Sequence, residues 1–118
     1  MATRSTINVK TAKGIVSIYS HWDGYPEHHM PILTECYNTQ EKAEELVSFG
    51  NLSILDRSIE KPEGHSFEKV SEGYCVFYGR DRGEENQKGR LIKTKKEIRK
   101  EEFTYYWNGK KWSCKEEN

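Results

Sequence analysis

The chain has 118 residues, a length that fits one domain with a buried core. Lys plus Arg and Asp plus Glu both number 19, so the formal net charge is zero. This balance argues against bulk electrostatic capture of a nucleic-acid polymer, although it allows a local basic pocket. Hydrophobic residues make up 34% and aromatic residues 12%, which predicts a small core rich in aromatic rings. We expect so polar a chain to gain stability by forming a homo-oligomer.

The three cysteines, Cys36, Cys75 and Cys114, lie far apart and form no Cys-x-x-Cys pair. An odd number of cysteines without a secretion signal is typical of reduced thiols in a cytosol. Residues 1–5 contain no apolar segment of a signal peptide, and no apolar run approaches the ~18 residues that span a membrane. The sequence therefore predicts a cytoplasmic protein with no membrane partner.

The N-terminal part of the chain predicts a hairpin followed by a corner. Residues 6–10 alternate polar and apolar side chains, residues 11–14 are typical of a turn, and residues 15–19 are β-branched and aromatic. The corner at residues 21–29 contains Gly24, which permits unusual backbone angles, and Pro26, which favours extended geometry at the residue before it.

Helical patterns follow the corner. We expect a helix over residues 30–37 with Pro31 in its first turn, where a missing N–H has little effect. A start at Pro26 would instead place Pro31 inside the helix and kink it. Asn38 and Glu41 resemble a capping box that opens a second helix, which Gly50 ends. Residues 52–55 are expected to form a short turn on the core.

The second half of the chain predicts mainly strands. Residues 56–72 form a long loop, and residues 74–78 form a strand that we expect to be central because it is apolar on both faces. A charged loop at 79–86, a short strand at 90–92 and a short helix at 94–102, opened by Thr94 and Glu97, come next. The dipeptide Asn108-Gly109 between residues 103–107 and 110–114 is a strong hairpin signal.

These elements predict a single domain of the α+β class. Its antiparallel sheet is built from the N-terminal and C-terminal hairpins plus a central strand, and two or three short helices pack on it.

Residues that can bind zinc gather around the corner, but their spacing matches no standard zinc site. They are His21, Asp23, His28, His29 and Cys36, with His65 far away. The alternative, which we favour, is a corner in which the imidazoles form hydrogen bonds with backbone groups. The sequence therefore predicts neither a metal nor a cofactor.

The corner also contains groups that resemble a nucleophile and a base. His21 lies two residues from Asp23, with Ser20 and Cys36 near them in the sequence. No catalytic motif, phosphate-binding loop or dinucleotide-binding fingerprint accompanies them. The sequence therefore favours a protein that is not an enzyme, while a small nucleotide hydrolase stays an alternative.

An anion or nucleotide pocket is the main candidate site. Arginine presents a planar fork that suits phosphate, and aromatic rings can stack on a base. The candidate ligand-binding residues are Phe77, Arg80, Arg82, Asn86, Arg90 and Trp107. A second candidate surface is the corner, with His21, Trp22, Asp23 and Tyr25. The alternative is an exposed loop whose charges compensate one another, because Asp81, Glu84 and Glu85 offset the arginines.

Several long stretches resemble a family of small phage and prophage proteins. They are residues 2–7 (ATRSTI), 21–28 (HWDGYPEH), 62–67 (PEGHSF), 73–84 (GYCVFYGRDRGE) and 108–112 (NGKKW), which together span nearly the whole chain. Pro31 departs from the family pattern, which affects the expected helix start more than the function. The family looks similar to the phage anti-Thoeris sponge proteins, which bind a cyclic ADP-ribose signal made by a host TIR-domain protein and do not cleave it.

This resemblance implies an antiparallel sheet with helices, assembly as a dimer or larger oligomer, and a pocket of stacking rings, arginines and an asparagine. The matching residues here would be Phe77, Arg80 or Arg82, and Asn86. We therefore expect a phage anti-defence protein that sequesters a small cyclic nucleotide in the cytoplasm of an infected bacterial host. The alternative is a protein–protein inhibitor of a host defence or regulatory complex, which would use the C-terminal hairpin or the corner as its contact face.

Overall fold

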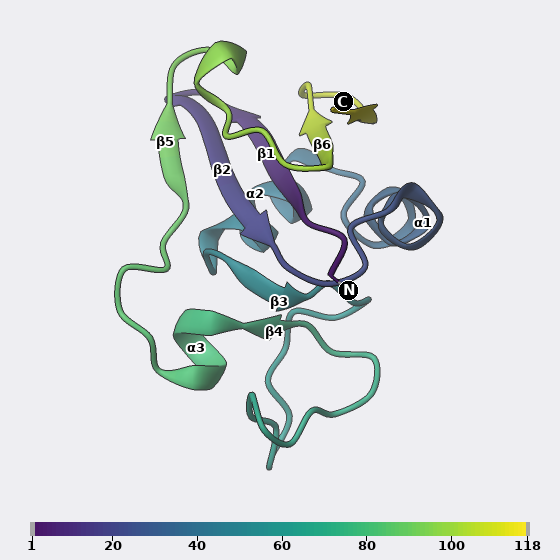
Figure 1. Ribbon diagram of the computed structural model, residues 1–118, viewed down its shortest axis with the longest axis vertical. Helices are drawn as coiled ribbons and strands as arrows, with labels where there is room; N and C mark the ends of the chain where they lie inside the picture. Colours follow the sequence, from purple (N-terminus) through teal and green to yellow (C-terminus); the bar gives the residue numbers. More distant parts are fainter. Residues whose placement is uncertain (1, 118) are drawn as a thin grey trace.

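The computed structural model describes residues 2–117, which fold as an α+β domain with a seven-stranded sheet (Figure 1). The α+β class predicted from the sequence is confirmed. The strands are β1 (Ser5–Thr11), β2 (Gly14–Ser20), β3 (Leu52–Ile54), β4 (Val76–Phe77), β5 (Arg90–Ile92), β6 (Phe103–Trp107) and β7 (Trp112–Glu116). The helices are α1 (Pro26–Cys36), α2 (Gln40–Ser48), α3 (Tyr78–Arg82) and the 3-10 turn η1 (Lys95–Glu97).

The two predicted hairpins form the middle and one side of the sheet, in which six strands follow the order β4-β3-β2-β1-β6-β7 and the seventh, β5, pairs with β2. Both hairpins are antiparallel, but β1 pairs with β6 in parallel, and β2 pairs with β3 in parallel. The sheet is therefore mixed, where a purely antiparallel sheet was expected. The difference arises because the chain crosses from β5, which pairs with β2, to the far side of β1, and this crossover places β6 parallel to β1.

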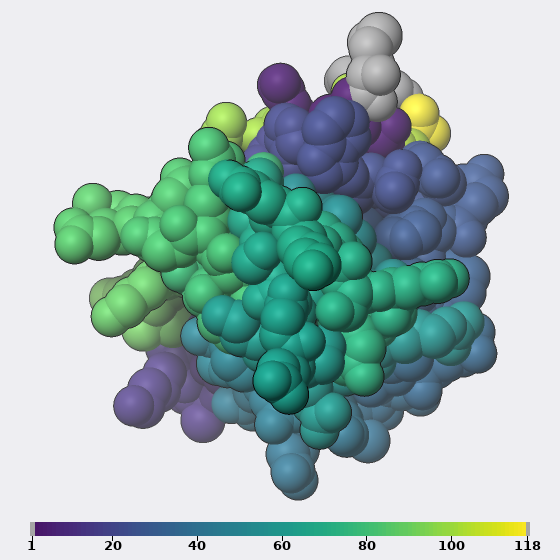
Figure 2. Space-filling model, turned by 90° about the horizontal axis from the view of Figure 1, so that it is seen from below, coloured from purple at the N-terminus to yellow at the C-terminus, as the bar shows by residue number. Residues whose placement is uncertain are grey.

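The strand expected to be central, around residues 74–78, is the short edge strand β4. Its residues are apolar on both faces because other segments cover them: Phe77 is fully buried against Phe49, with ring centroids 5.0 Å apart. The loop at residues 56–75 covers this end of the molecule and forms the front surface in Figure 2. The amide of Cys75 donates to the carbonyl of Ser58 at 2.8 Å, which anchors the loop beside β4.

Helix α1 begins at Pro26, four residues earlier than expected, so Pro31 lies inside it. The corner explains this start, because Tyr25 is extended and Pro26 occupies the first turn, where its missing N–H has no partner to lose. Helix α2 is capped by Thr39, whose hydroxyl accepts from the amide of Lys42 at 3.1 Å, and not by Asn38. Residues 52–54 form a strand where a turn was expected. Helix α3 spans residues 78–82, where Tyr78 was expected to end a strand and residues 79–82 to lie in a loop.

The two longer helices pack on one face of the sheet and build an aromatic-rich core. Ile7, Leu33, Leu46 and Tyr105 are fully buried there. The indole of Trp107 donates to Gln40 at 2.7 Å, so its N–H is satisfied inside the core. Among residues 2–117, no helix combines the length and the apolar character that a bilayer crossing requires.

The segment between β5 and β6 crosses the opposite face of the sheet, in front of β1 in Figure 1. Only the turn η1 forms where a helix over 94–102 was expected. The Thr94–Glu97 capping box is present, since the Glu97 carboxylate accepts from the Thr94 amide at 2.9 Å. Ile98 then packs with Ile15 and Ile92 in a second, smaller cluster, which fixes the segment on this face.

Candidate functional site

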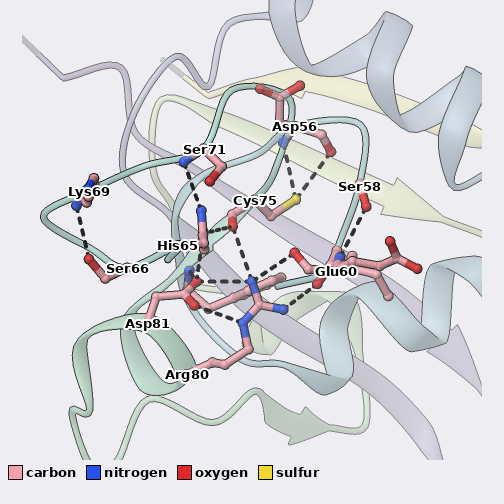
Figure 3. A network of polar contacts seen from close by, with 12 residues as sticks. Asp56, Ser58, Glu60, His65, Ser66, Lys69, Ser71, Cys75, Arg80 and Asp81 are labelled. Carbon is pink, nitrogen blue, oxygen red and sulfur yellow. Dashed lines mark hydrogen bonds and ion pairs between the residues drawn. The ribbon is translucent and has the colours of Figure 1, made fainter. Parts of the chain in front are cut away.

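Arg80, one of the predicted ligand-binding residues, lies in an internal network beneath the loop at residues 56–75 (Figure 3). Its Nε donates to Asp81 Oδ1 at 2.9 Å, and its Nη2 donates to Asp81 Oδ2 at 3.2 Å. The remaining N–H groups of Arg80 donate to the backbone carbonyls of Ile59, Glu60 and Cys75. All three nitrogens of the guanidinium thus donate to the protein itself, and a ligand would have to displace these hydrogen bonds.

His65 completes this network and is itself buried. The amide of Ser71 donates to His65 Nδ1 at 3.0 Å, so Nε2 carries the proton and donates to the carbonyl of Cys75 at 3.1 Å. His65 Nε2 also lies 3.6 Å from Asp81 Oδ2, and both side chains are fully buried. The imidazole therefore braces the loop and has no position from which to activate the Cys75 thiol.

The Asp81 carboxylate is the anionic centre of the network. Burial raises its pKa, but hydrogen bonds from Arg80 and from the Phe77 amide outweigh burial, so the pKa of Asp81 lies below its ordinary value. The Phe77 amide donates to Asp81 Oδ2 at 2.8 Å, which ties the network directly to β4. The arrangement holds the loop, β4 and α3 together, and it gives Arg80 a structural role.

The two aromatic rings predicted to stack on a ligand lie in the core. Phe77 is fully buried and carries the Arg80 guanidinium 4.9 Å from its ring centroid. Trp107 is only 2% exposed and contacts Trp112, with ring centroids 5.6 Å apart. Neither ring offers a free face to a ligand in this conformation.

Arg82 lies on α3 but outside the network. Its Nε pairs with Glu84 Oε2 at 3.3 Å, and its guanidinium lies 4.7 Å from the Phe67 ring centroid. The shallow hollow beside it is also lined by Glu68 and Asp81, so acidic groups offset its charge. This geometry corresponds to the self-compensating loop that the sequence offered as the alternative.

Asn86 and Arg90, the two remaining predicted residues, do come together. They line a small pocket of about 150 Å³ on the sheet face opposite the helices, with Tyr19, Lys88 and Arg99. We call this site the arginine pocket. Hydroxyls of Thr6 and Ser17 also line it, and no lining residue is acidic, histidine or cysteine. Three cationic side chains and one aromatic ring therefore surround a hollow in a protein of zero net charge.

Arg99 and Tyr19 were not singled out from the sequence. The Arg99 guanidinium lies 5.7 Å from the Tyr19 ring centroid, and its Nε pairs with Glu101 at 2.7 Å. Burial raises the pKa of the Tyr19 hydroxyl, although nearby Arg4 acts in the opposite direction. Arg99 belongs to a Lys- and Glu-rich stretch typical of a solvated helix face, so only its placement across the sheet reveals the contact with Tyr19.

The loop that carries Asn86 is held firmly against the sheet edge. Asn51 donates its backbone N–H to the carbonyl of Gln87 at 2.7 Å, and its side-chain amide donates to Gln87 Oε1 at 3.1 Å. The Asn51 Oδ1 also accepts from the Tyr19 amide at 2.8 Å. Gly50 has a φ of +84°, and a Cβ there would lie 2.2 Å from the Gln87 carbonyl oxygen. The close approach of this loop therefore requires glycine at position 50.

We expect Gly50→Ala to destabilise the protein by about 2 to 4 kcal/mol, because the new Cβ combines backbone strain with a clash against backbone atoms. Gly64→Ala is the matched control, since Gly64 has a φ of +81° and no atom within 4 Å of its added Cβ. This control should lose only about 1 kcal/mol, the strain of positive φ alone. Urea unfolding of both variants measures the difference, and equal losses would contradict a tightly packed loop.

The corner residues form a second group beside the arginine pocket. His21 Nδ1 and the Tyr19 hydroxyl are 2.7 Å apart, so the corner braces the ring that lines the pocket. Asp23 has a φ of 55° and is exposed, and it forms no ion pair within residues 2–117. Trp22 and Tyr25 are exposed by 42% and 38%. The structure thus links His21 to the pocket and leaves the two aromatic rings at the surface.

A chain of hydrogen bonds from Ser20 through His29 to His28 runs under the corner, and sequence reasoning did not predict it. Ser20 Oγ lies 2.9 Å from His29 Nε2, and the Nδ1 atoms of His29 and His28 are 2.9 Å apart. The spacing resembles a hydrolase relay, but Ser20 and His29 are both fully buried, so a substrate has no access. Among the described residues, no three His, Cys, Asp or Glu side chains cluster as metal ligands do.

The pH dependence of stability should report on His29. Burial and neighbouring His28 lower the pKa of His29 to about 3, whereas an unfolded histidine titrates near 6.5. The unfolded state therefore binds the proton first, and stability should fall as the pH drops from about 6.5 towards 3, by at most ~1.4 kcal/mol per pH unit. Urea unfolding at pH 7.5, 6 and 5 measures this loss. His29→Gln should show a flatter profile over the same range, and an unchanged slope would contradict the assignment.

Comparison of the chain with protein-family models, with curated proteins and with solved structures finds no match in any of the three, so the candidate site rests on its own geometry.

Proposed function

We propose that this protein is a non-enzymatic binding protein that sequesters a small cyclic nucleotide of the cyclic ADP-ribose type. In this proposal it acts as a phage anti-defence protein in the cytoplasm of an infected bacterial host. The observation that carries the proposal is the arginine pocket, where predicted Asn86 and Arg90 meet Tyr19, Lys88 and Arg99 with no acidic lining residue.

The groups of the arginine pocket suit the parts of such a ligand. Arg90 supplies an unpaired guanidinium fork for a pyrophosphate, and Lys88 supplies a further positive charge. Arg99 supplies a second guanidinium, whose Nε is also paired with Glu101. The Tyr19 ring, braced by His21, offers an aromatic surface to a base. The Asn86 side-chain amide can donate to and accept from a base edge or a ribose.

The small volume of the arginine pocket supports a ligand site that is shared between two copies of the chain. Its volume of about 150 Å³ is smaller than the ~300 Å³ that small-molecule sites typically reach. A second copy of the chain placed over the same sheet face would complete the enclosure. The proposal therefore includes a homo-oligomer, as the composition and the resemblance also imply.

Capture without turnover is supported by the position of the nucleophiles. The Ser20 hydroxyl and the Cys75 thiol are fully buried, and no histidine or carboxylate lines the arginine pocket beside the Thr6 and Ser17 hydroxyls. A sponge needs only affinity and abundance, because it has to hold the free signal below the threshold of the host effector.

The test is to incubate the purified protein with a panel of cyclic nucleotides and ADP-ribose isomers, filter it, denature the retained protein and analyse the released material by mass spectrometry. An intact nucleotide in the released fraction is the expected result. A converted product would instead identify a hydrolase. If micromolar protein leaves every cyclic ADP-ribose isomer free in solution, the proposal is wrong.

The exposed rings of Trp22 and Tyr25 favour the second candidate, a protein–protein inhibitor of a host defence or regulatory complex. Both rings come from the corner before α1 and would anchor a protein contact. A defined partner whose binding survives Arg90→Ala but is lost in Trp22→Ala would support this candidate. Loss of binding in both variants would instead assign the partner to the arginine pocket.

A further inference from the structure

A second and larger hollow lies on the same sheet face, on the other side of the segment that joins β5 to β6. Its volume is about 550 Å³, within the range of small-molecule sites. The hollow is bounded by Lys95, Lys96, Ile98 and Lys100 on that segment and by Tyr106 and Lys115 on the C-terminal hairpin. We call it the lysine pocket. It shares no lining residue with the arginine pocket.

The lysine pocket concentrates positive charge. Four lysines and one acidic residue, Glu117, are among the lining residues. Glu117 is already engaged, because Thr104 Oγ1 donates to its Oε2 at 2.9 Å and Lys115 Nζ lies 3.8 Å from its Oε1. Lys95, Lys96 and Lys100 form no ion pair with any residue in 2–117. Three positive charges at the lysine pocket are thus free to pair with an anionic ligand.

The back wall of the lysine pocket is apolar and fixed. Tyr106 is half-buried and packs against the cluster of Ile15, Ile92 and Ile98, which holds the wall in place. The Lys95 ammonium lies 4.1 Å from the Tyr106 ring centroid, a cation–π contact that a ligand can replace with a phosphate and a stacked ring. A cationic rim and an aromatic wall together match a ligand with a phosphate chain and a flat organic group.

The arrangement of charges at the lysine pocket favours a small ligand over a nucleic-acid polymer. Lysine ammonium groups bind phosphate as point charges, and four of them around one hollow suit a compact cluster of negative charge. A nucleic-acid polymer would need an extended basic face, whereas the whole chain has zero net charge.

We propose that the lysine pocket binds a nucleoside polyphosphate, with the phosphate chain held by Lys95, Lys96, Lys100 and Lys115 and the base packed against Tyr106. This site is independent of the arginine pocket. It adds a second ligand to the protein and does not require the first.

Isothermal titration calorimetry with ATP and with inorganic triphosphate tests the proposal. ATP should bind, and triphosphate should bind more weakly because it lacks a base to pack on Tyr106. Lys96→Glu/Lys100→Glu should weaken both ligands by about tenfold or more for each lysine, since charged hydrogen bonds are lost. Tyr106→Leu should weaken ATP and leave triphosphate unchanged.

The matched control is Lys61→Glu/Lys69→Glu, which changes the net charge equally at exposed lysines of the loop at residues 56–75. This control and Arg90→Glu should both keep ATP affinity. ATP binding therefore tests the lysine pocket alone, whatever the result for the cyclic nucleotide at the arginine pocket. Three results would overturn the proposal: no binding of either ligand, equal weakening in the control, or tighter binding of a single-stranded oligonucleotide than of ATP through the same lysines. ATP that binds no more tightly than triphosphate would refute packing of the base on Tyr106.

Discussion

Arg80→Met should destabilise the protein by about 3 to 5 kcal/mol, the range for removing one partner of a buried ion pair. The substitution leaves the Asp81 carboxylate fully buried without its cation. It also removes the donors to the carbonyls of Ile59, Glu60 and Cys75, which hold the loop at residues 56–75. Urea unfolding gives the stability, and hydrogen exchange should show the loop amides losing protection first.

Arg82→Met is the matched control, because Arg82 lies on the same helix but 53% of its side chain is exposed in its pair with Glu84. We expect a change of less than about 1 kcal/mol. The double variant Arg80→Met/Asp81→Asn should recover part of the loss, since it removes the uncompensated charge. Equal stability of the Arg80 and Arg82 variants would contradict a structural role for Arg80.

The same network has a defined pH dependence. The pKa of Asp81 is lowered in the folded state, so its contribution is present above the unfolded pKa of about 3.9 and is lost as the pH falls through the lower folded pKa. Arg80→Met should therefore have its largest effect at neutral pH and a smaller one below about pH 4, where the variant can bury a protonated Asp81.

Arg90→Glu/Arg99→Gln should weaken capture of the cyclic nucleotide by about a hundredfold or more, because two charged contacts to phosphate are lost and a carboxylate is added. Arg90 is the sharper single test, since it is exposed and forms no ion pair with the described residues. Equilibrium binding of the ligand identified by mass spectrometry, measured at two salt concentrations, gives the affinity and its charge dependence.

Lys42→Glu/Lys61→Gln changes the net charge by the same amount at exposed positions away from the arginine pocket and should retain full affinity. Tyr19→Phe should also bind, because the ring is kept, whereas Tyr19→Leu should not. Unchanged affinity in the arginine variant, with the fold intact by circular dichroism, would exclude the arginine pocket as the site of capture.

The elements that the sequence predicted well are those whose signals are local. Alternation over residues 6–10 and the Asn108-Gly109 turn each specify a hairpin within a dozen residues. The Thr94–Glu97 capping box also formed as predicted, but only a single turn follows it because packing of Ile98 on the sheet ends the helix. The start of α1 was shifted by four residues, since two prolines competed for the first turn.

Local sequence patterns did not predict the partners or the burial of several candidate site residues. Arg80 beside glycine and aromatic residues is typical of a ligand loop, yet its partners are carbonyls about twenty residues earlier in the chain. Phe77 and Trp107 were expected to stack on a ligand, but both are core residues because β4 and β6 pair with other strands in the sheet. Burial depends on the whole sheet, so periodicity within a segment did not reveal it.

By itself, the sequence determined the α+β class, the two hairpins, the absence of bulk basic charge and the candidacy of Asn86 and Arg90. The tertiary structure alone decided that β1 and β6 pair in parallel, and that Arg99 crosses the sheet to meet Tyr19. The tertiary structure also decided that Arg80 has a structural role. These outcomes depend on contacts between segments far apart in the chain, whose free energy comes from shared burial and charge pairing that no single stretch contains.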